Sequence, residues 1–251
     1  MARNIKLTLA YDGCDFAGWQ VQPNQLTIQG VLVSVIEQIT GEKTLPQGSG
    51  RTDAGVHALA QVATVSVESP IPVLNFRKAL NHVLPRAIRV MDAEEVPVNF
   101  HARKSARAKT YQYRIYRGEI CAPFLARYVY HHPYPLDEDA IADAAEVVVG
   151  EHDFTSFAAV DPDARAENEE VNNTRTVYIS NWQCVGDEFV YTVRGNGFLH
   201  HMVRNLVGTF LMIGKGNLTN KDLKRILDLR DRSAAAATAP AGGLYLVSVE
   251  Y

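Results

Sequence analysis

Hydrophobic residues in this chain follow two different spacings, and both spacings occur in each half. In the first half, residues 4–12 alternate apolar and polar positions as a half-buried strand does, and residues 28–39 carry one apolar stripe as a helix does. In the second half, residues 109–117 alternate and residues 199–213 carry a stripe. Strands and helices therefore mix without strict strand–helix–strand alternation, which predicts an α+β fold, with helices on one face of two sheets, rather than a doubly wound parallel sheet.

Cap and turn signals add to this outline. Thr27 is suited to cap the helix of residues 28–39 and Gly41 to end it, and Gly186–Asp187 predicts a hairpin turn. Thr219 and Asp222 together predict the start of another helix. The remaining expected elements are strands at 60–67, 87–96, 175–185, 188–195 and 244–249, and helices at 72–84, 137–150 and 219–229.

Length and composition exclude several classes of protein. The chain has 251 residues, 47% of them hydrophobic and 21% charged, which is an ordinary globular mixture for one large domain or two small ones. It contains no run of 18 apolar residues, so no membrane helix is expected, and residues 1–11 are too short and too polar for a signal peptide. Three scattered cysteines without a CxxC pattern predict a cytoplasmic protein with neither a disulfide framework nor a zinc cluster.

Charge is distributed unevenly along the chain. The formal net charge is −3, yet residues 137–170 hold twelve acidic residues and one basic residue. Residues 103–117 hold basic residues and no acid, and a polyanion would be attracted to that part of the chain. A solvated basic face with no ligand is the alternative. The basic residues are Arg103, Lys104, Arg107, Lys109, Arg114 and Arg117.

The most unusual stretch is GSGRTDAGVHA at residues 48–58. Its glycines permit tight turns and close approach of a ligand, and Arg51 favours the ionised form of the nearby Asp53. An ionised, positioned aspartate is a candidate nucleophile or base. The alternative is a plain turn in which Asp53 binds local amides. The stretch matches neither the P-loop nor the dinucleotide-binding pattern.

Two further stretches are candidates for a functional site. Tyr111 and Tyr113 share one side of the expected strand at 109–117, where they either stack on bases or pack in the core. The apolar helix expected at 199–213 carries Arg204 on its flank, and such a cation usually needs a carboxylate partner. His200 and His201 are adjacent, about 100° apart on a helix, so no metal site is expected there.

Five motifs together resemble one known family. They are GRTDAGVHA at 50–58, KTYQYRIY at 109–116, HDFTSF at 152–157, GNGFLHHMVRNLVGT at 195–209 and APAGGLYL at 239–246. The chain is similar at these positions to the tRNA pseudouridine synthase A family, and the similarity extends over nearly its whole length.

The resemblance implies an activity and a fold. The family isomerises uridine to pseudouridine at positions 38, 39 and 40 in the anticodon stem-loop of tRNA, as a cytoplasmic homodimer that uses no cofactor and no metal. Its fold has two α+β domains, each like a ferredoxin or RNA-recognition domain with a mixed or antiparallel sheet, and a cleft between them. For this chain we expect an N-terminal domain at residues 1–105, carrying the catalytic loop, and a C-terminal domain at residues 106–251.

The resemblance also implies roles for individual residues. Asp53 matches the catalytic aspartate, Arg204 pairs with it, Tyr111 lies against the target base, Arg51 helps to displace the target nucleotide, and Leu244 packs at the pocket. We expect Arg103, Lys104, Arg107 and Lys109 to contact the RNA backbone. Two other functions remain as alternatives: a non-catalytic RNA-binding module, which would not need Asp53, and a hydrolase of nucleosides or glycosides, which usually uses two carboxylates.

Overall fold

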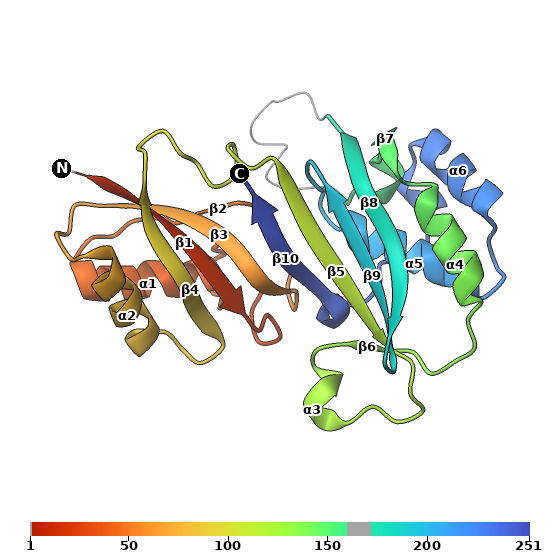
Figure 1. Cartoon of the computed structure of the whole chain (residues 1–251), viewed down its shortest axis with the longest axis horizontal. Coiled ribbons are helices and arrows are strands. Elements are labelled where there is room, and N and C mark those ends of the chain that lie inside the picture. The colour runs from red at the N-terminus through yellow and green to blue at the C-terminus, as the bar shows by residue number, and fades with distance from the viewer. Residues whose placement is uncertain (1, 160–171) are drawn as a thin grey trace. The chain divides into compact units, whose positions relative to one another are not determined.

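A computed structural model describes residues 2–159 and 172–251 of the chain. Its contacts divide the chain into two compact units, one of residues Met1–Lys109 with Tyr245–Tyr251 and one of Thr110–Leu244. Both units combine a sheet with helices, so the α+β class predicted from the sequence is confirmed (Figure 1). The boundary at residues 105/106 stays a prediction. The part of the acidic stretch within residues 160–171 lies outside the described residues.

The first unit has the strand–helix–strand–strand–helix–strand order of a ferredoxin-like fold. Its sheet has the order β4-β1-β3. The short β2 pairs antiparallel with β3 at Ala63 and Thr64, and β10 pairs parallel with the beginning of β3, at His57 and Ala58. β1 is antiparallel to both β3 and β4. The elements are β1 (Arg3–Tyr11), α1 (Ile28–Thr40), β2 (Gln47–Gly48), β3 (His57–Val67), α2 (Val73–Val83), β4 (Ile88–Val96) and β10 (Leu244–Glu250).

Apolar alternation on β1 and apolar stripes on the helices form the core of this unit. Leu7 and Leu9 of β1 are fully buried, as are Leu32 of α1 and Leu80 of α2. The two helices contact one another (Figure 1). α1 begins at its predicted cap, where the Thr27 side chain accepts a hydrogen bond from the Gly30 amide, and it ends at Gly41 in the left-handed conformation with φ 76°.

The second unit has a sheet of order β5-β9-β8-β7, with the short β6 parallel to β5. β8 and β9 form the predicted hairpin, and Gly186 takes φ 58° at its turn. The strands are β5 (Ala108–Tyr116), β6 (Tyr130–His131), β7 (Gly150–Asp153), β8 (Thr174–Val185) and β9 (Glu188–Gly195). The helices are α3 (Pro123–Ala126), α4 (Glu138–Glu146), α5 (Met202–Gly214) and α6 (Asn220–Leu229), with short 3₁₀ turns at Thr155–Phe157, Arg232–Ala234 and Ala241–Gly243.

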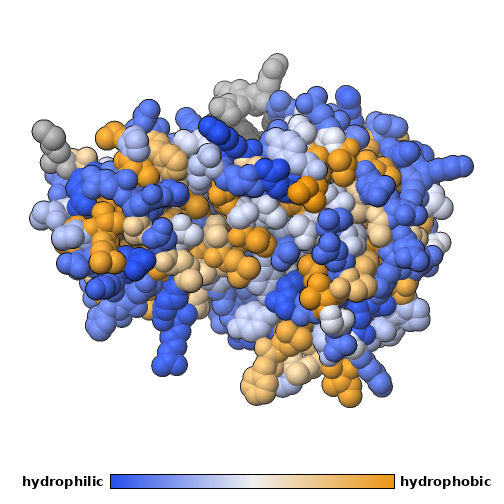
Figure 2. Space-filling model, viewed as in Figure 1, coloured by the Kyte–Doolittle hydropathy of each residue, from blue (hydrophilic) through white to orange (hydrophobic). Residues whose placement is uncertain are grey.

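α5 is the central helix of the second unit. Its Phe210 contacts Trp182 of β8 and Tyr191 of β9 edge-on, and α4 packs against both α5 and β8. α6 begins with the predicted capping box of Thr219 and Asp222. Exposed apolar side chains gather around α3, where Phe124 is 91% exposed (Figure 2). None of the helices in the described residues has the length and apolar character that crossing a bilayer requires.

Two predicted helices have different bounds in the structure. The helix predicted over 199–213 begins only at Met202, because His201 takes the left-handed conformation with φ 60° and interrupts helical geometry there. The helix predicted over 137–150 ends at Glu146, since Gly150 with φ 107° opens β7. In both cases the helix is shorter than predicted, and the residues that it lacks adjoin a segment that contains glycine.

Candidate active site

The glycine-flanked loop of the first unit connects β2 to β3. Before the loop, Gly48 pairs with Ala63, and the amide of Ser49 donates a 2.7 Å hydrogen bond to the carbonyl of Val62. After the loop, His57 opens β3. Residues 50–56 are therefore held by the sheet at both ends.

A buried polar network supports the loop from the side of the sheet. Gln61 of β3 is fully buried; its amide oxygen accepts from the Ser49 hydroxyl at 2.6 Å, and its amide nitrogen donates to the Gly50 carbonyl at 2.9 Å. The Thr52 hydroxyl lies 2.8 Å from the Tyr11 hydroxyl at the end of β1. Burial raises the pKa of Tyr11 to about 12, so this hydroxyl keeps its proton at neutral pH. These bonds fix the loop backbone on both sides of Arg51.

The segment after β1 packs closely over the same loop. The amide of Trp19 donates to the Thr52 carbonyl at 3.0 Å. A Cβ at Gly18, which has φ +92°, would lie 2.6 Å from that carbonyl oxygen, and a Cβ at Gly13 would collide with the carbonyl of Val56. Backbone approaches this close require glycine at both positions.

Asp53 lies at the start of a turn inside this supported loop. Its carbonyl accepts a 3.1 Å hydrogen bond from the Val56 amide, and Gly55 takes φ +78° within the turn. The main chain thus closes the turn, and the half-buried carboxylate of Asp53 is carried on a fixed backbone. Arg51 is exposed, and its Nε donates to the Gln20 side chain at 3.1 Å.

Lys109 also contacts the loop. Its Nζ donates a 2.6 Å hydrogen bond to the carbonyl of Ser49. The neighbouring Gly50 leaves the space that the lysine occupies, since a Cβ there would lie 2.9 Å from Nζ. The first residue of the KTYQY motif is therefore linked to the residue before GRTDAG, a link that neither motif shows by itself.

In the second unit, the two tyrosines of β5 have different surroundings. Both lie on the same side of the strand, as the alternation predicted, and the structure buries both. Tyr113 is fully buried, its hydroxyl donates to the Pro240 carbonyl at 2.8 Å, and burial raises its pKa. Tyr111 contacts Phe198 edge-on, with ring centroids 5.0 Å apart. Tyr113 is thus part of the core, and Tyr111 lies beside the glycine-rich stretch that precedes α5.

Arg204 lies in the first turn of α5 and is half-buried. Its Nε donates to the Ala239 carbonyl at 2.8 Å, and its own carbonyl accepts from the Ala239 amide at 3.1 Å. The APAGGLYL segment is therefore attached to α5 at this residue. Leu244, in the same segment, is buried, and a Cβ at Gly243 would lie 2.9 Å from the Tyr113 ring.

The HDFTSF motif supports α5 and α6 from within the second unit. Phe154 and Phe157 are fully buried. The Phe157 carbonyl accepts from the Asn205 side chain of α5 at 2.6 Å, and the Ser156 hydroxyl donates to the Ile226 carbonyl of α6 at 2.5 Å. This motif fixes the helix that carries Arg204.

The basic residues of 103–117 differ in their surroundings. Arg103, Lys104 and Arg107 are exposed. Arg114 forms two 2.6 Å hydrogen bonds to Glu188, and Arg117 pairs with Glu138 at 3.1 Å. The cations at the start of the stretch are therefore exposed, and those at its end are ion-paired.

A further cluster in the first unit contains potential metal ligands. Asp12, Cys14 and His57 place one donor atom each within 4.8 Å of the others. Nδ1 of His57 already accepts from the Gly13 amide at 3.1 Å, and the Asp12 carboxylate accepts from the Cys14 amide at 3.0 Å. These donors hold the segment after β1 in place, so we assign no metal to them.

The candidate site residues fall in both units. Arg51 and Asp53 belong to the first, and Tyr111, Arg204 and Leu244 belong to the second. The pairing of Arg204 with Asp53 stays a prediction. Gln61 and Tyr11 were not predicted from the sequence as supports of the loop; a glutamine in the middle of a Val- and Thr-rich strand was the available signal for Gln61.

Comparison with known proteins agrees with these motifs. The sequence profile of a tRNA pseudouridine synthase family matches residues 8–103 and 144–251. The chain is 54% identical over 250 residues to the tRNA pseudouridine synthase A of Solibacter usitatus (strain Ellin6076), which covers 99% of this chain and 100% of that protein. It is 45% identical to the protein of that name from Caldicellulosiruptor bescii and 44% identical to the one from Brevibacillus brevis, each over 249 residues, 99% of this chain and 100% of the relative.

A solved structure described as the archaeal box H/ACA sRNP Nop10-Cbf5 complex aligns with 92% of this chain and 59% of its own, at 12% identity and a TM-score of 0.33, too low to carry an argument. The similarity to full-length relatives, together with the α+β fold, places the chain in a class of isomerases. It belongs to the tRNA pseudouridine synthase family.

Proposed function

We propose that this enzyme converts uridine to pseudouridine at positions 38, 39 and 40 in the anticodon stem-loop of tRNA, with Asp53 as its catalytic carboxylate. The observation that carries the proposal is the support of the Asp53 loop by Gln61, Tyr11 and Lys109, because a loop held this firmly can position one carboxylate. Family membership supplies the reaction class.

The reaction moves one bond and keeps every atom of the substrate. The N-glycosidic bond at C1′ breaks, the uracil turns, and its C5 bonds to C1′. Positive charge develops on the sugar as the first bond breaks, and a carboxylate stabilises or captures such a sugar in glycosidases. Three roles for Asp53 satisfy this chemistry: addition to C1′, attack on the uracil, or abstraction of a sugar proton. Nothing is oxidised and no water is added, so the reaction as proposed needs no redox cofactor.

The other site residues have distinct proposed tasks. Tyr111 and Leu244 form the apolar surface that retains the detached uracil. Arg204 pairs with Asp53 and orients its carboxylate. The target nucleotide must leave the base stack, at a cost of a few kcal/mol, and Arg51 occupies the space that it leaves. The Ala239 carbonyl, which accepts from Nε of Arg204, supports this assignment because it orients the guanidinium.

Binding of the RNA backbone is assigned to Arg103, Lys104, Arg107 and Lys109. Contacts to phosphates provide affinity without reading sequence, which suits an enzyme that modifies several neighbouring positions. Exposure of the first three supports their assignment. We further propose that the enzyme acts in the cytoplasm as a homodimer, which light scattering of the purified chain tests.

The test is pseudouridine mapping in unmodified tRNA treated with wild-type enzyme and with Asp53→Asn. We expect modification at positions 38–40 by the wild type, none by the variant, and tRNA binding by both. Asp228→Asn, which removes an exposed carboxylate on α6, is the matched control and should retain full activity. Full activity in Asp53→Asn would refute the assignment. Binding without modification by the wild type would indicate an RNA-binding module, and release of free uracil a hydrolase.

A further inference from the structure

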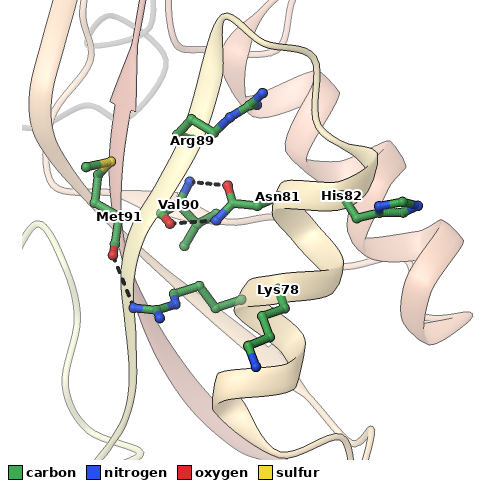
Figure 3. A pocket seen from close by; sticks show the side chains of 7 residues that line it. Lys78, Asn81, His82, Arg89, Val90 and Met91 are labelled. Carbon is green, nitrogen blue, oxygen red and sulfur yellow. Dashed lines mark hydrogen bonds between the residues drawn. The ribbon is translucent and has the colours of Figure 1, made fainter.

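A second basic region lies in the first unit, between α2 and β4. Residues 69–91 contain four lysines and arginines and no aspartate or glutamate. Here α2 and β4 enclose a surface hollow of about 550 Å³, with side chains of both elements around it (Figure 3). The lining residues are Arg77, Lys78, Asn81, His82, Arg89, Val90 and Met91.

Hydrogen bonds to the edge strand fix the shape of this hollow. The Asn81 side chain donates to the Val90 carbonyl at 2.8 Å and accepts from the Val90 amide at 2.9 Å, so it occupies the place of a neighbouring strand (Figure 3). Arg77 donates to the Met91 carbonyl at 3.3 Å, and Arg89 donates to the Pro85 carbonyl at 2.7 Å. These bonds hold the backbone and two guanidinium groups in one position, which lowers the entropy cost of binding an anion.

Within the described residues, one weak ion pair is recorded for the cations that line the hollow. Arg77 lies 3.6 Å from Asp92, and both side chains are partly exposed, so this pair is weak. Lys78 and His82 are exposed, and both line the hollow from α2. The lining itself contains no carboxylate, so the hollow favours an anion with several negative charges.

The register of the sheet places the hollow at the same end as the catalytic loop. Val90 pairs with Leu9, and Leu9 pairs with Gln61, whose side chain binds the Gly50 carbonyl of the loop. Two strand spacings, about 10 Å, therefore separate Val90 from Gln61. If an RNA binds at the loop, its neighbouring phosphate groups are therefore close enough to contact the cations of α2.

We propose that the α2–β4 hollow binds the sugar-phosphate backbone of the substrate RNA within a few nucleotides of the modified uridine. This inference rests on the proposed function, because it takes the RNA at the Asp53 loop as its starting point. Lys78 supplies a mobile charge to one phosphate, while Arg77 and Arg89 present fixed ones. The hollow thus adds affinity for the RNA next to the loop.

The test compares Lys78→Gln with Lys43→Gln, using wild-type enzyme as the reference. Lys43 is also exposed in the first unit, but it follows Glu42, whose carboxylate binds the Ser69 amide beyond the far end of β3. For Lys78→Gln we expect two- to five-fold weaker tRNA binding, about the contribution of one exposed ion pair. The slope of log Kd against log salt should fall by about 0.7–0.9, and kcat at saturating tRNA should be unchanged. Lys43→Gln should match the wild type.

The same comparison on an isolated anticodon stem-loop RNA tests the location. We expect the Lys78→Gln defect to persist there, and Lys78→Glu to enlarge it on both RNAs. Wild-type KM and salt slope in both Lys78 variants would overturn the inference, and so would a defect confined to full-length tRNA. Pseudouridine formation by the wild type is measured first; its absence would refute the proposed function, whereas its presence with unaffected Lys78 variants would refute the hollow alone.

Discussion

Nζ of Lys109 donates a 2.6 Å hydrogen bond to the backbone carbonyl of Ser49, directly before the glycine-flanked loop that carries Asp53. The two residues are separated by 60 positions in sequence. The bond connects two motifs that the sequence presents separately, and it gives Lys109 a structural contact besides its proposed one with RNA.

Replacement of Lys109 by methionine should separate these two roles. Loss of a partly buried, charged hydrogen bond costs about 1.5–3 kcal/mol. Because this bond holds the loop, its loss should make the loop less ordered. We expect at least a ten-fold fall in kcat on tRNA from the loosened loop, together with a fall of about 0.7–0.9 in the salt slope from the lost phosphate contact. If Lys109 only binds phosphate, KM rises, the salt slope falls and kcat is unchanged. Lys43→Met controls for loss of a lysine at an exposed position.

Gln61→Leu should be the more destabilising change to the same loop. Leucine has nearly the same volume, but it leaves the Ser49 hydroxyl, the Gly50 carbonyl and the Val62 amide without their partner in a buried place. Each of the three lost partners costs about 1–3 kcal/mol, so we expect a total loss of about 3 kcal/mol or more in urea denaturation. A loss below 0.5 kcal/mol would show that the network contributes nothing to stability. Ala63→Val, a change of packing on the same strand, indicates how much of the loss is due to shape alone.

Gly13→Ala should displace the catalytic loop. The added Cβ meets the carbonyl of Val56, a backbone atom that moves only if the loop or the segment after β1 moves with it. We expect a loss of about 1–3 kcal/mol in stability and a larger proportional loss of activity. Gly41→Ala is the comparison, since the site is open and only its φ of +76° opposes alanine. That variant should be destabilised by about 1 kcal/mol with normal kcat; equal kcat values in the two variants would contradict the close packing over the loop.

Tyr11 should make stability fall at alkaline pH. Burial raises its pKa from 10.0 to about 12 in the folded protein, so between these values the unfolded chain loses the phenolic proton first. Fewer protons on the unfolded state mean that the free energy of unfolding decreases as pH rises, and at pH 11 this group accounts for about 1.4 kcal/mol of the loss.

Urea denaturation of Tyr11→Phe at several pH values checks this. At pH 7 the variant should be about 1 kcal/mol less stable, because it lacks the hydrogen bond to Thr52. That difference should shrink above pH 10 and reach zero near pH 11. A constant difference across the whole range would show that Tyr11 does not titrate with a raised pKa.

Much of the fold follows from local signals in the sequence. Thr27 and Gly41 bound α1 as predicted, and the capping box of Thr219 begins α6. The alternation on β5 correctly placed Tyr111 and Tyr113 on one side of the strand; that this side is buried was left open by the sequence. These predictions succeeded because a cap, a stripe or an alternation depends on residues a few positions apart.

Elements stabilised by distant partners were not predictable in this way. The two-residue strands β2 and β6 have no periodicity of their own and exist because β3 and β5 pair with them. The helix containing Arg204 begins at Met202 because His201 takes a left-handed backbone that its apolar neighbours do not signal. The roles of Gln61 and Tyr11 likewise depend on which strands are neighbours.

The sequence by itself determined the class of fold, the helices and strands with strong periodicity, and the motif that contains Asp53. Tertiary structure decided how that motif is held: a lysine 60 positions away, a buried glutamine and a tyrosine hydroxyl all meet one loop. Local patterns report which face of an element is apolar. Buried hydrogen bonds need partners that only the folded arrangement of strands brings within about 3 Å.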